Sequence, residues 1–101
     1  DETFLRSQYY FLADKLDDIK RRLDYLSKPI IDQGYLRKNN RGRFELPSGR
    51  EFTSGSTCEI LYTDEDEQYW IVTTIQHRYD YYAAALGVEK SIDGMMVRVR
   101  T

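Results

Sequence analysis

The side chains best suited to catalysis in this 101-residue chain are those of its one histidine, His77, and its one cysteine, Cys58. A Ser-His-Asp or Cys-His device needs a nucleophile within hydrogen-bonding distance of a base. His77 lies at the end of a β-like run, and the strand pattern gives no reason for Cys58 or a serine to lie beside it. We therefore expect a histidine at the surface or rim, no catalytic residues, and a protein that is not an enzyme.

The sequence also lacks the ligand patterns of common metal sites. One Cys and one His do not provide the four ligands of a structural zinc site. A calcium loop requires Gly at its sixth position and Glu at its twelfth. Counting from Asp64, at the start of the acidic run 64–67, these places hold Tyr69 and Ile75. We expect no metal and no cofactor, and we interpret the acidic run as a solvated turn.

Basic residues are concentrated between positions 37 and 50, on the first expected hairpins. Basic hairpin tips of small barrels can contact phosphates, which makes these residues candidates for nucleic-acid binding. The alternative is a solvated turn whose charge is balanced by Glu45 and Glu51, and we favour that alternative. The candidate phosphate-binding residues are Arg37, Lys38, Arg41, Arg43 and Arg50.

Aromatic residues are frequent in the second half of the chain. Aromatic grooves bind proline-rich peptides on SH3-like barrels and stack on bases in oligonucleotide-binding barrels. Core packing is the commoner use of any single aromatic residue. The candidates for an aromatic binding face are Tyr62, Trp70, Tyr79, Tyr81 and Tyr82.

The elements that would position these residues divide near Gly34. Before Gly34, apolar residues recur at alternating spacings of four and three, the pattern of a coiled-coil-like helix. Asp1 or Thr3 can cap its N-terminus, and Pro29 should end it near residues 27–28. Gly34 suits a left-handed position after the helix. The expected helix interface consists of Leu5, Tyr9, Leu12, Leu16, Ile19, Leu23, Leu26 and Ile30.

After Gly34, short β-like runs alternate with turns. The expected strands cover residues 35–38, 43–46, 51–53, 57–62, 69–77, 81–86 and 95–100. The run 69–77 is apolar on both faces, so one face can fill a barrel while the other lies under the helix. We therefore predict an α+β fold in one domain, 1–101. It has an N-terminal helical segment (1–33) packed on a small SH3-like β-barrel of five or six short antiparallel strands (34–101).

Composition restricts the class of protein further. Hydrophobic residues make up 41% and charged residues 32%, which is typical of a folded, water-soluble chain. The net charge of −2 provides no global attraction to nucleic acid or to an anionic membrane. The longest apolar runs are a few residues, so no membrane span is expected. The single cysteine excludes an internal disulfide and, with no signal-peptide pattern, favours a cytoplasmic location.

Several motifs of the second half resemble a known family. They are the run 42–49 (GRFELPSG), the segments 52–55 (FTSG), 59–60 (EI) and 70–71 (WI), and the closing run 94–100 (GMMVRVR). From Tyr35 to the end, the chain resembles a small bacterial family of uncharacterised domains that is often encoded on mobile elements. The resemblance implies a helical N-terminus with an SH3-like barrel, and it implies no activity.

The helix leaves two arrangements open. Its seam can be covered by the chain's own barrel, or it can bind a second helix. Arg6, Lys15, Lys20 and Arg22 flank the seam, where a parallel twin would place like charges together. An antiparallel homodimer or an acidic foreign helix relieves that repulsion.

The predicted function is a non-enzymatic interaction module that binds a protein partner, or a second copy of itself, through its helix or its aromatic barrel face. The alternative is a nucleic-acid-binding accessory protein that uses the hairpins at 37–50.

Overall fold

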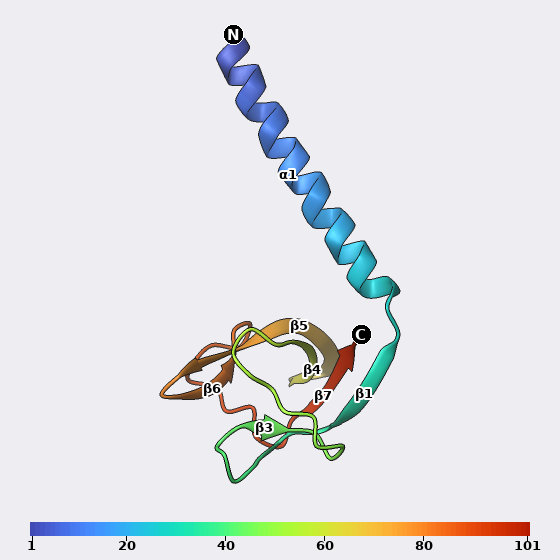
Figure 1. Ribbon diagram of the computed structural model, residues 1–101, viewed down its shortest axis with the longest axis vertical. Helices are drawn as coiled ribbons and strands as arrows, with labels where there is room; N and C mark the ends of the chain where they lie inside the picture. The colour runs from blue at the N-terminus through green and yellow to red at the C-terminus, as the bar shows by residue number, and fades with distance from the viewer.

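The computed structural model describes residues 1–101 as one long helix joined to a small β unit. The helix α1 (Glu2–Ser27) projects from the β unit as a separate arm (Figure 1). The molecule measures 58 × 31 × 31 Å, and its radius of gyration is 17.2 Å. A compact chain of this length has a radius of gyration of about 13 Å. The difference arises because the helix extends away from the β unit.

Local chemistry accounts for both ends of α1. Asp1 is the N-cap, and its Oδ1 accepts hydrogen bonds from the backbone amides of Thr3 (3.0 Å) and Phe4 (3.3 Å). At the other end, Lys28 has an extended backbone, as expected for a residue that precedes proline. The predicted helix and its end near residues 27–28 are therefore confirmed.

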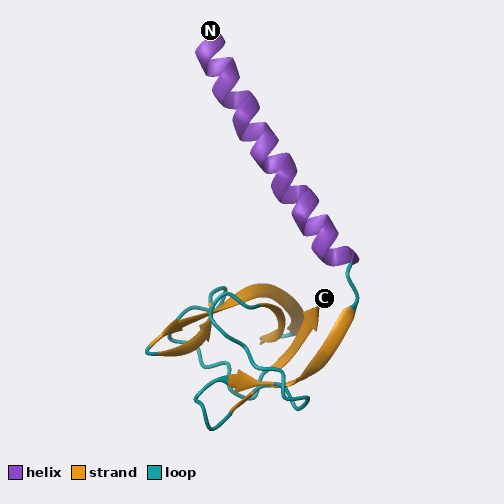
Figure 2. Ribbon diagram, in the orientation of Figure 1, coloured by secondary structure: helices purple, strands orange, loops and turns teal.

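The β unit is built around one antiparallel sheet (Figure 2). Its strands are β1 (Ile30–Tyr35), β4 (Thr57–Asp64), β5 (Glu67–Arg78), β6 (Asp80–Ala83) and β7 (Met96–Arg100), in the order β1-β7-β4-β5-β6. Two short strands, β2 (Arg37–Lys38) and β3 (Phe44–Glu45), form a second sheet. The acidic run 64–67 consists of the last residue of β4, a two-residue turn and the first residue of β5, and all four residues are exposed.

The core lies entirely within the β unit, on the concave side of the sheet. The buried apolar residues are Leu36, Phe44, Leu46, Phe52, Cys58, Ile60, Ile75, Ala83, Ile92, Val97 and Val99. No residue of α1 is buried. The stability of the β unit therefore comes from its own side chains, without a contribution from an apolar face of the helix.

The α+β class is confirmed, but two parts of the detailed fold prediction are wrong. A closed barrel requires its two edge strands to pair with each other. Here the edge strands β1 and β6 do not pair, so the sheet is open. The helix is not packed on the sheet. The outer sheet face carries Glu59, Arg98 and Arg100 next to the helix base, so it offers α1 charged groups in place of an apolar surface.

The segment around Gly34 also differs from expectation. Strand β1 begins at Ile30, inside the segment 1–33 predicted to be helical, and Ile30 pairs with Arg100. Gly34 lies in this strand opposite Val97 and is not a left-handed helix terminator. A Cβ atom at Gly34 would lie 2.5 Å from Cδ of Pro47, so glycine is needed for close approach of two chain segments.

Candidate interaction surface

The main exposed apolar surface of the molecule is on α1. Ten large apolar side chains of this helix are between 49 and 68% exposed: Phe4, Leu5, Tyr9, Tyr10, Phe11, Leu12, Leu16, Ile19, Leu23 and Leu26. A contiguous apolar surface of this kind is rare on a protein that functions alone. The structure contains no helix with the combination of length and hydropathy that a membrane span requires. We call the row Leu5, Tyr9, Leu12, Leu16, Ile19, Leu23 and Leu26 the seam.

The seam faces away from the β unit. Tyr25 is the only half-buried residue of α1, and its side chain points to the sheet. At about 100° per residue, Leu16 and Leu23 lie roughly 180° and 160° around the helix axis from Tyr25. The β unit therefore leaves the seam accessible along its length. Of the expected interface residues, only Ile30 is separated from the others, because it belongs to β1.

A polar cluster anchors the base of α1 to the sheet. Its centre is Glu59 on β4, whose side chain is 3% exposed. Oε2 of Glu59 accepts hydrogen bonds from Oη of Tyr25 (2.7 Å) and Nε of Arg100 (2.6 Å). Oε1 accepts a hydrogen bond from Nε of Arg98 (2.7 Å). A buried carboxylate with three donors is satisfied, so this cluster can hold a charge inside the fold.

The two arginines connect this carboxylate to its surroundings. Nη1 of Arg100 donates hydrogen bonds to the backbone carbonyls of Leu26 (3.3 Å) and Lys28 (2.9 Å), which are free at the helix end. The guanidinium of Arg98 lies 4.0 Å from the ring centre of Trp70. Arg98 therefore covers the outer face of β5, where the sequence suggested that the helix would lie.

The anchor changes the pKa of its members. Burial alone raises the pKa of Glu59, but the hydrogen bonds from Arg100, Tyr25 and Arg98 outweigh it and lower the pKa to about 2. Burial and the hydrogen bond to Glu59 raise the pKa of Tyr25 to about 12. At neutral pH the cluster therefore consists of a carboxylate, a neutral phenol and two guanidinium groups.

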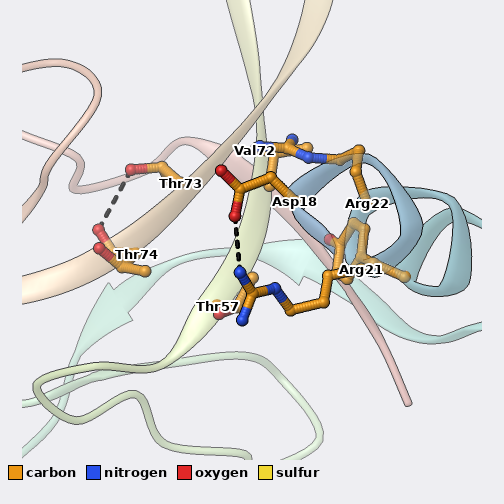
Figure 3. A pocket seen from close by; sticks show the side chains of 8 residues that line it. Asp18, Arg21, Arg22, Thr57, Val72, Thr73 and Thr74 are labelled. Carbon is orange, nitrogen blue, oxygen red and sulfur yellow. Dashed lines mark hydrogen bonds and ion pairs between the residues drawn. The ribbon is translucent and has the colours of Figure 1, made fainter. Parts of the chain in front are cut away.

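An open polar cleft of about 510 Å³ lies between the helix base and the sheet (Figure 3). Its helical wall includes Asp18, Arg21 and Arg22, and its sheet wall includes Thr57 and Thr74. Figure 3 shows the Arg21 guanidinium directed at Asp18, with an Nη2–Oδ1 distance of 2.6 Å. Asp18 and Arg21 pair with each other, and the lining is mostly polar, unlike the predominantly apolar pockets that bind small molecules.

All five basic residues that were candidates for phosphate binding form ion pairs within the chain. The pairs, with their nitrogen–oxygen distances, are Arg37–Glu45 (3.5 Å), Lys38–Asp80 (2.5 Å), Arg41–Glu51 (3.1 Å), Arg43–Glu51 (3.7 Å) and Arg50–Asp32 (3.2 Å). Two of the carboxylates are the ones that the sequence suggested as balancing charges. Because Arg41 and Arg43 share Glu51, the five basic residues meet four carboxylates, and most of their positive charge is neutralised, which lowers the attraction of the hairpins for phosphate.

The five aromatic candidates do not share one face. Tyr62 and Tyr81 lie on the core side of the sheet, where Tyr62 packs against Tyr69 and Tyr81 against His77. Trp70 and Tyr82 lie on strand positions that face the opposite side. Tyr79 is 94% exposed at the β5–β6 turn. No continuous aromatic groove results from this arrangement.

His77 and Cys58 do not form a catalytic pair. His77 lies at the exposed end of β5 with its ring 4.6 Å from that of Tyr81. Cys58 is fully buried in the core, and burial raises its pKa to about 12. A thiol with this pKa is almost entirely protonated at neutral pH and is a poor nucleophile.

Comparison with known protein families assigns the β unit to one of them. Residues 34–99 match the family described as "Domain of unknown function (DUF5348)". The chain belongs to the DUF5348 family. No curated protein and no solved structure matches the chain. The resemblance to a family without an assigned function is confirmed, over nearly the residues that the sequence motifs suggested.

The match also separates the molecule into two parts. The DUF5348 region contains the whole core and two members of the anchor, Glu59 and Arg98. The helix α1, with Tyr25 and the seam, lies outside the matched residues. The apolar surface described above is therefore carried by an arm attached to the DUF5348 region.

Sequence analysis missed the anchor. One signal was present: Glu59 interrupts the apolar run of β4 between Cys58 and Ile60, and a carboxylate at a buried strand position requires partners. Arg98 and Arg100 alternate with Val97 and Val99 in the last expected strand, but nothing in the sequence indicated that the arginine face meets Glu59. Their proximity depends on the pairing of β4 with β7, which joins segments far apart in the chain.

Proposed function

We propose that this chain is a non-enzymatic interaction module that binds a protein partner through the seam of α1. The observation that carries the proposal is a helix with ten exposed large apolar residues whose seam faces away from its own β unit. Helices in proteins owe most of their stability to packing of an apolar face. Since α1 finds no such packing within the chain, a partner helix is the natural source of it.

In this proposal the DUF5348 region is a folded support that holds the end of α1. The anchor at Glu59 fixes the last turn of α1, while the seam extends about 30 Å beyond it at 1.5 Å per residue. The basic hairpins support a nucleic-acid function poorly, because their charges are already paired. A bacterial origin, a cytoplasmic location and an association with mobile elements stay predictions.

The proposal is tested by photo-crosslinking in the native cell. A photoreactive amino acid replaces Leu16, in the seam, or Asp14, which lies on the opposite side of the helix. We expect crosslinks to another protein chain from position 16 and none from position 14. Equal products from both positions, or crosslinks from position 16 only to the chain's own β unit, would contradict the proposal.

A further inference from the structure

We infer that the partner of α1 is an acidic amphipathic helix of another protein, in preference to a second copy of this chain. The inference rests on the proposed function, because it describes the chemistry of the same surface. It follows from the charges that border the seam.

The seam has the heptad order of a coiled coil. Tyr9, Leu16 and Leu23 occupy a positions, and Leu5, Leu12, Ile19 and Leu26 occupy d positions. The e and g positions border such a seam and face the partner helix. All charged residues at these positions are basic: Arg6 and Lys20 at e, and Lys15 and Arg22 at g. The carboxylates Asp14, Asp17, Asp18 and Asp24 occupy b, c and f positions, away from the seam.

Most of the basic charges along the seam are free to meet a partner. Arg21 and Asp18 form an ion pair on the side of α1 away from the seam, so this pair uses none of the basic residues at the e and g positions. Arg6 has only a solvent-exposed contact with Glu2 (3.5 Å), and the ammonium of Lys15 lies 5.3 Å from the ring centre of Phe11. Lys20 and Arg22 form no ion pair within the chain, whereas every basic residue of the hairpins forms one.

A second copy of this helix does not supply the missing charges. In a parallel pair each g position faces an e position of the next heptad, which places Lys15 opposite Lys20 of the twin. In an antiparallel pair e faces e and g faces g, so a basic residue meets either another basic residue or a neutral one. Neither orientation contains an attractive pair, and an antiparallel homodimer relieves the repulsion only where a basic residue meets a neutral one. A foreign helix with Glu or Asp at its e and g positions pairs with all four basic residues.

A membrane surface fits the helix less well. Interfacial helices carry Lys and Arg over their polar face, which rests near anionic headgroups. The polar face of α1 carries four aspartates, and the second half of the helix has a narrow seam of a and d residues only. This width suits one partner helix.

The experiment compares two labelled peptide probes for binding to the full chain by fluorescence anisotropy. Both are four-heptad peptides with Leu and Ile at a and d; one has Glu at every e and g position, and the other has Lys. We expect the Glu probe to bind at least about tenfold more tightly, with a preference that shrinks as salt is raised. The variant Lys15→Glu/Lys20→Glu/Arg22→Glu should reverse the preference. The matched control Arg21→Glu, at an f position, should preserve it, and circular dichroism checks that both variants fold.

Other outcomes separate the inference from the proposed function. Equal affinity for the two probes, both lost on Leu16→Glu, overturns the inference and leaves the proposed function standing. A wild-type mass of twice 12.0 kDa in light scattering that survives the triple charge reversal overturns it in favour of a second copy. Binding to phosphatidylglycerol vesicles without binding to the Glu probe overturns it in favour of a membrane. Absence of both probe binding and crosslinking from position 16 defeats the proposed function itself.

Discussion

Tyr25 and Glu59, separated by 34 residues in the chain, are joined by a hydrogen bond of 2.7 Å between the phenol and a buried carboxylate. It is the only hydrogen bond from a side chain of α1 to the β unit. The other polar contacts at this junction are the hydrogen bonds from Arg100 to the carbonyls of residues 26 and 28. The direction of a 26-residue helix therefore depends on a few polar groups at its last turn.

The first prediction concerns the acid sensitivity of this junction. The pKa of Glu59 is lowered from its usual 4.5 to about 2 in the folded state, so the unfolded chain binds the proton more readily. The stabilisation is complete above about pH 4.5 and is lost as the pH falls through about 2. Glu59→Gln should lower the free energy of unfolding by about 3 kcal/mol at pH 7 and remove this part of the pH dependence. Urea unfolding of Glu59→Gln and of the exposed control Glu67→Gln at several pH values tests the prediction, and identical curves would contradict it.

The second prediction concerns Gly34. An added Cβ would lie 2.5 Å from Cδ of Pro47, so one of the two segments must shift. Gly34→Ala should lower the free energy of unfolding by about 1–3 kcal/mol. Since Pro47 is exposed, the double variant Gly34→Ala/Pro47→Ala should recover most of this loss. Thermal melts of the three proteins measure both effects, and a failure of the second substitution to rescue the first would place the strain elsewhere.

The sequence predicted the local features of this fold well. The four–three spacing of apolar residues predicted α1, and Pro29 predicted its end, because both depend on neighbouring residues. The positions of most strands followed from alternation and turn residues, including β5. Trp70, a candidate for the aromatic binding face, is half-buried, and the guanidinium of Arg98 lies over its ring.

The remaining errors concern contacts between distant segments. An exposed seam and a seam covered by a barrel have the same sequence pattern, so the sequence left both arrangements open. The outcome depends on the outer sheet face, where Glu59 meets Arg98 and Arg100 only after β4 pairs with β7. The role of Gly34 likewise depends on Pro47, which local propensity does not reveal.

The third prediction concerns the reactivity of Cys58. Burial, followed by the nearby charge of Glu59, raises the pKa of its thiol to about 12. Because the thiolate is the reactive form, Cys58 should resist a thiol reagent such as 5,5′-dithiobis(2-nitrobenzoic acid) in the folded protein at pH 8. Complete labelling in denaturant provides the control. Rapid labelling of the folded protein would show that the core opens readily.

The fourth prediction concerns the basic hairpins. Arg41 and Arg43 share the carboxylate of Glu51, so the three side chains together keep one net positive charge in place of two. Arg41→Gln/Arg43→Gln should bind labelled DNA and RNA as weakly as the wild type does, at every salt concentration. If the hairpins did contact phosphates, the slope of log affinity against log salt would decrease by about one for each charge removed.

The last prediction concerns the stability of the seam variants. Leu16 and Leu23 are 66% and 63% exposed, so their replacement leaves no cavity and buries no charge within the chain. Leu16→Glu/Leu23→Glu should change the free energy of unfolding of the isolated protein by about 0.5 kcal/mol or less, while the core control Ile60→Ala should lower it by about 2–5 kcal/mol. The same double variant should lose binding to a partner helix, which requires an apolar seam. Denaturant unfolding at several protein concentrations distinguishes a seam that is free in the isolated protein from a seam that is already covered by a second copy. A large loss of stability in the double variant, growing with protein concentration, would mean that the seam is already occupied by a second copy in the isolated protein.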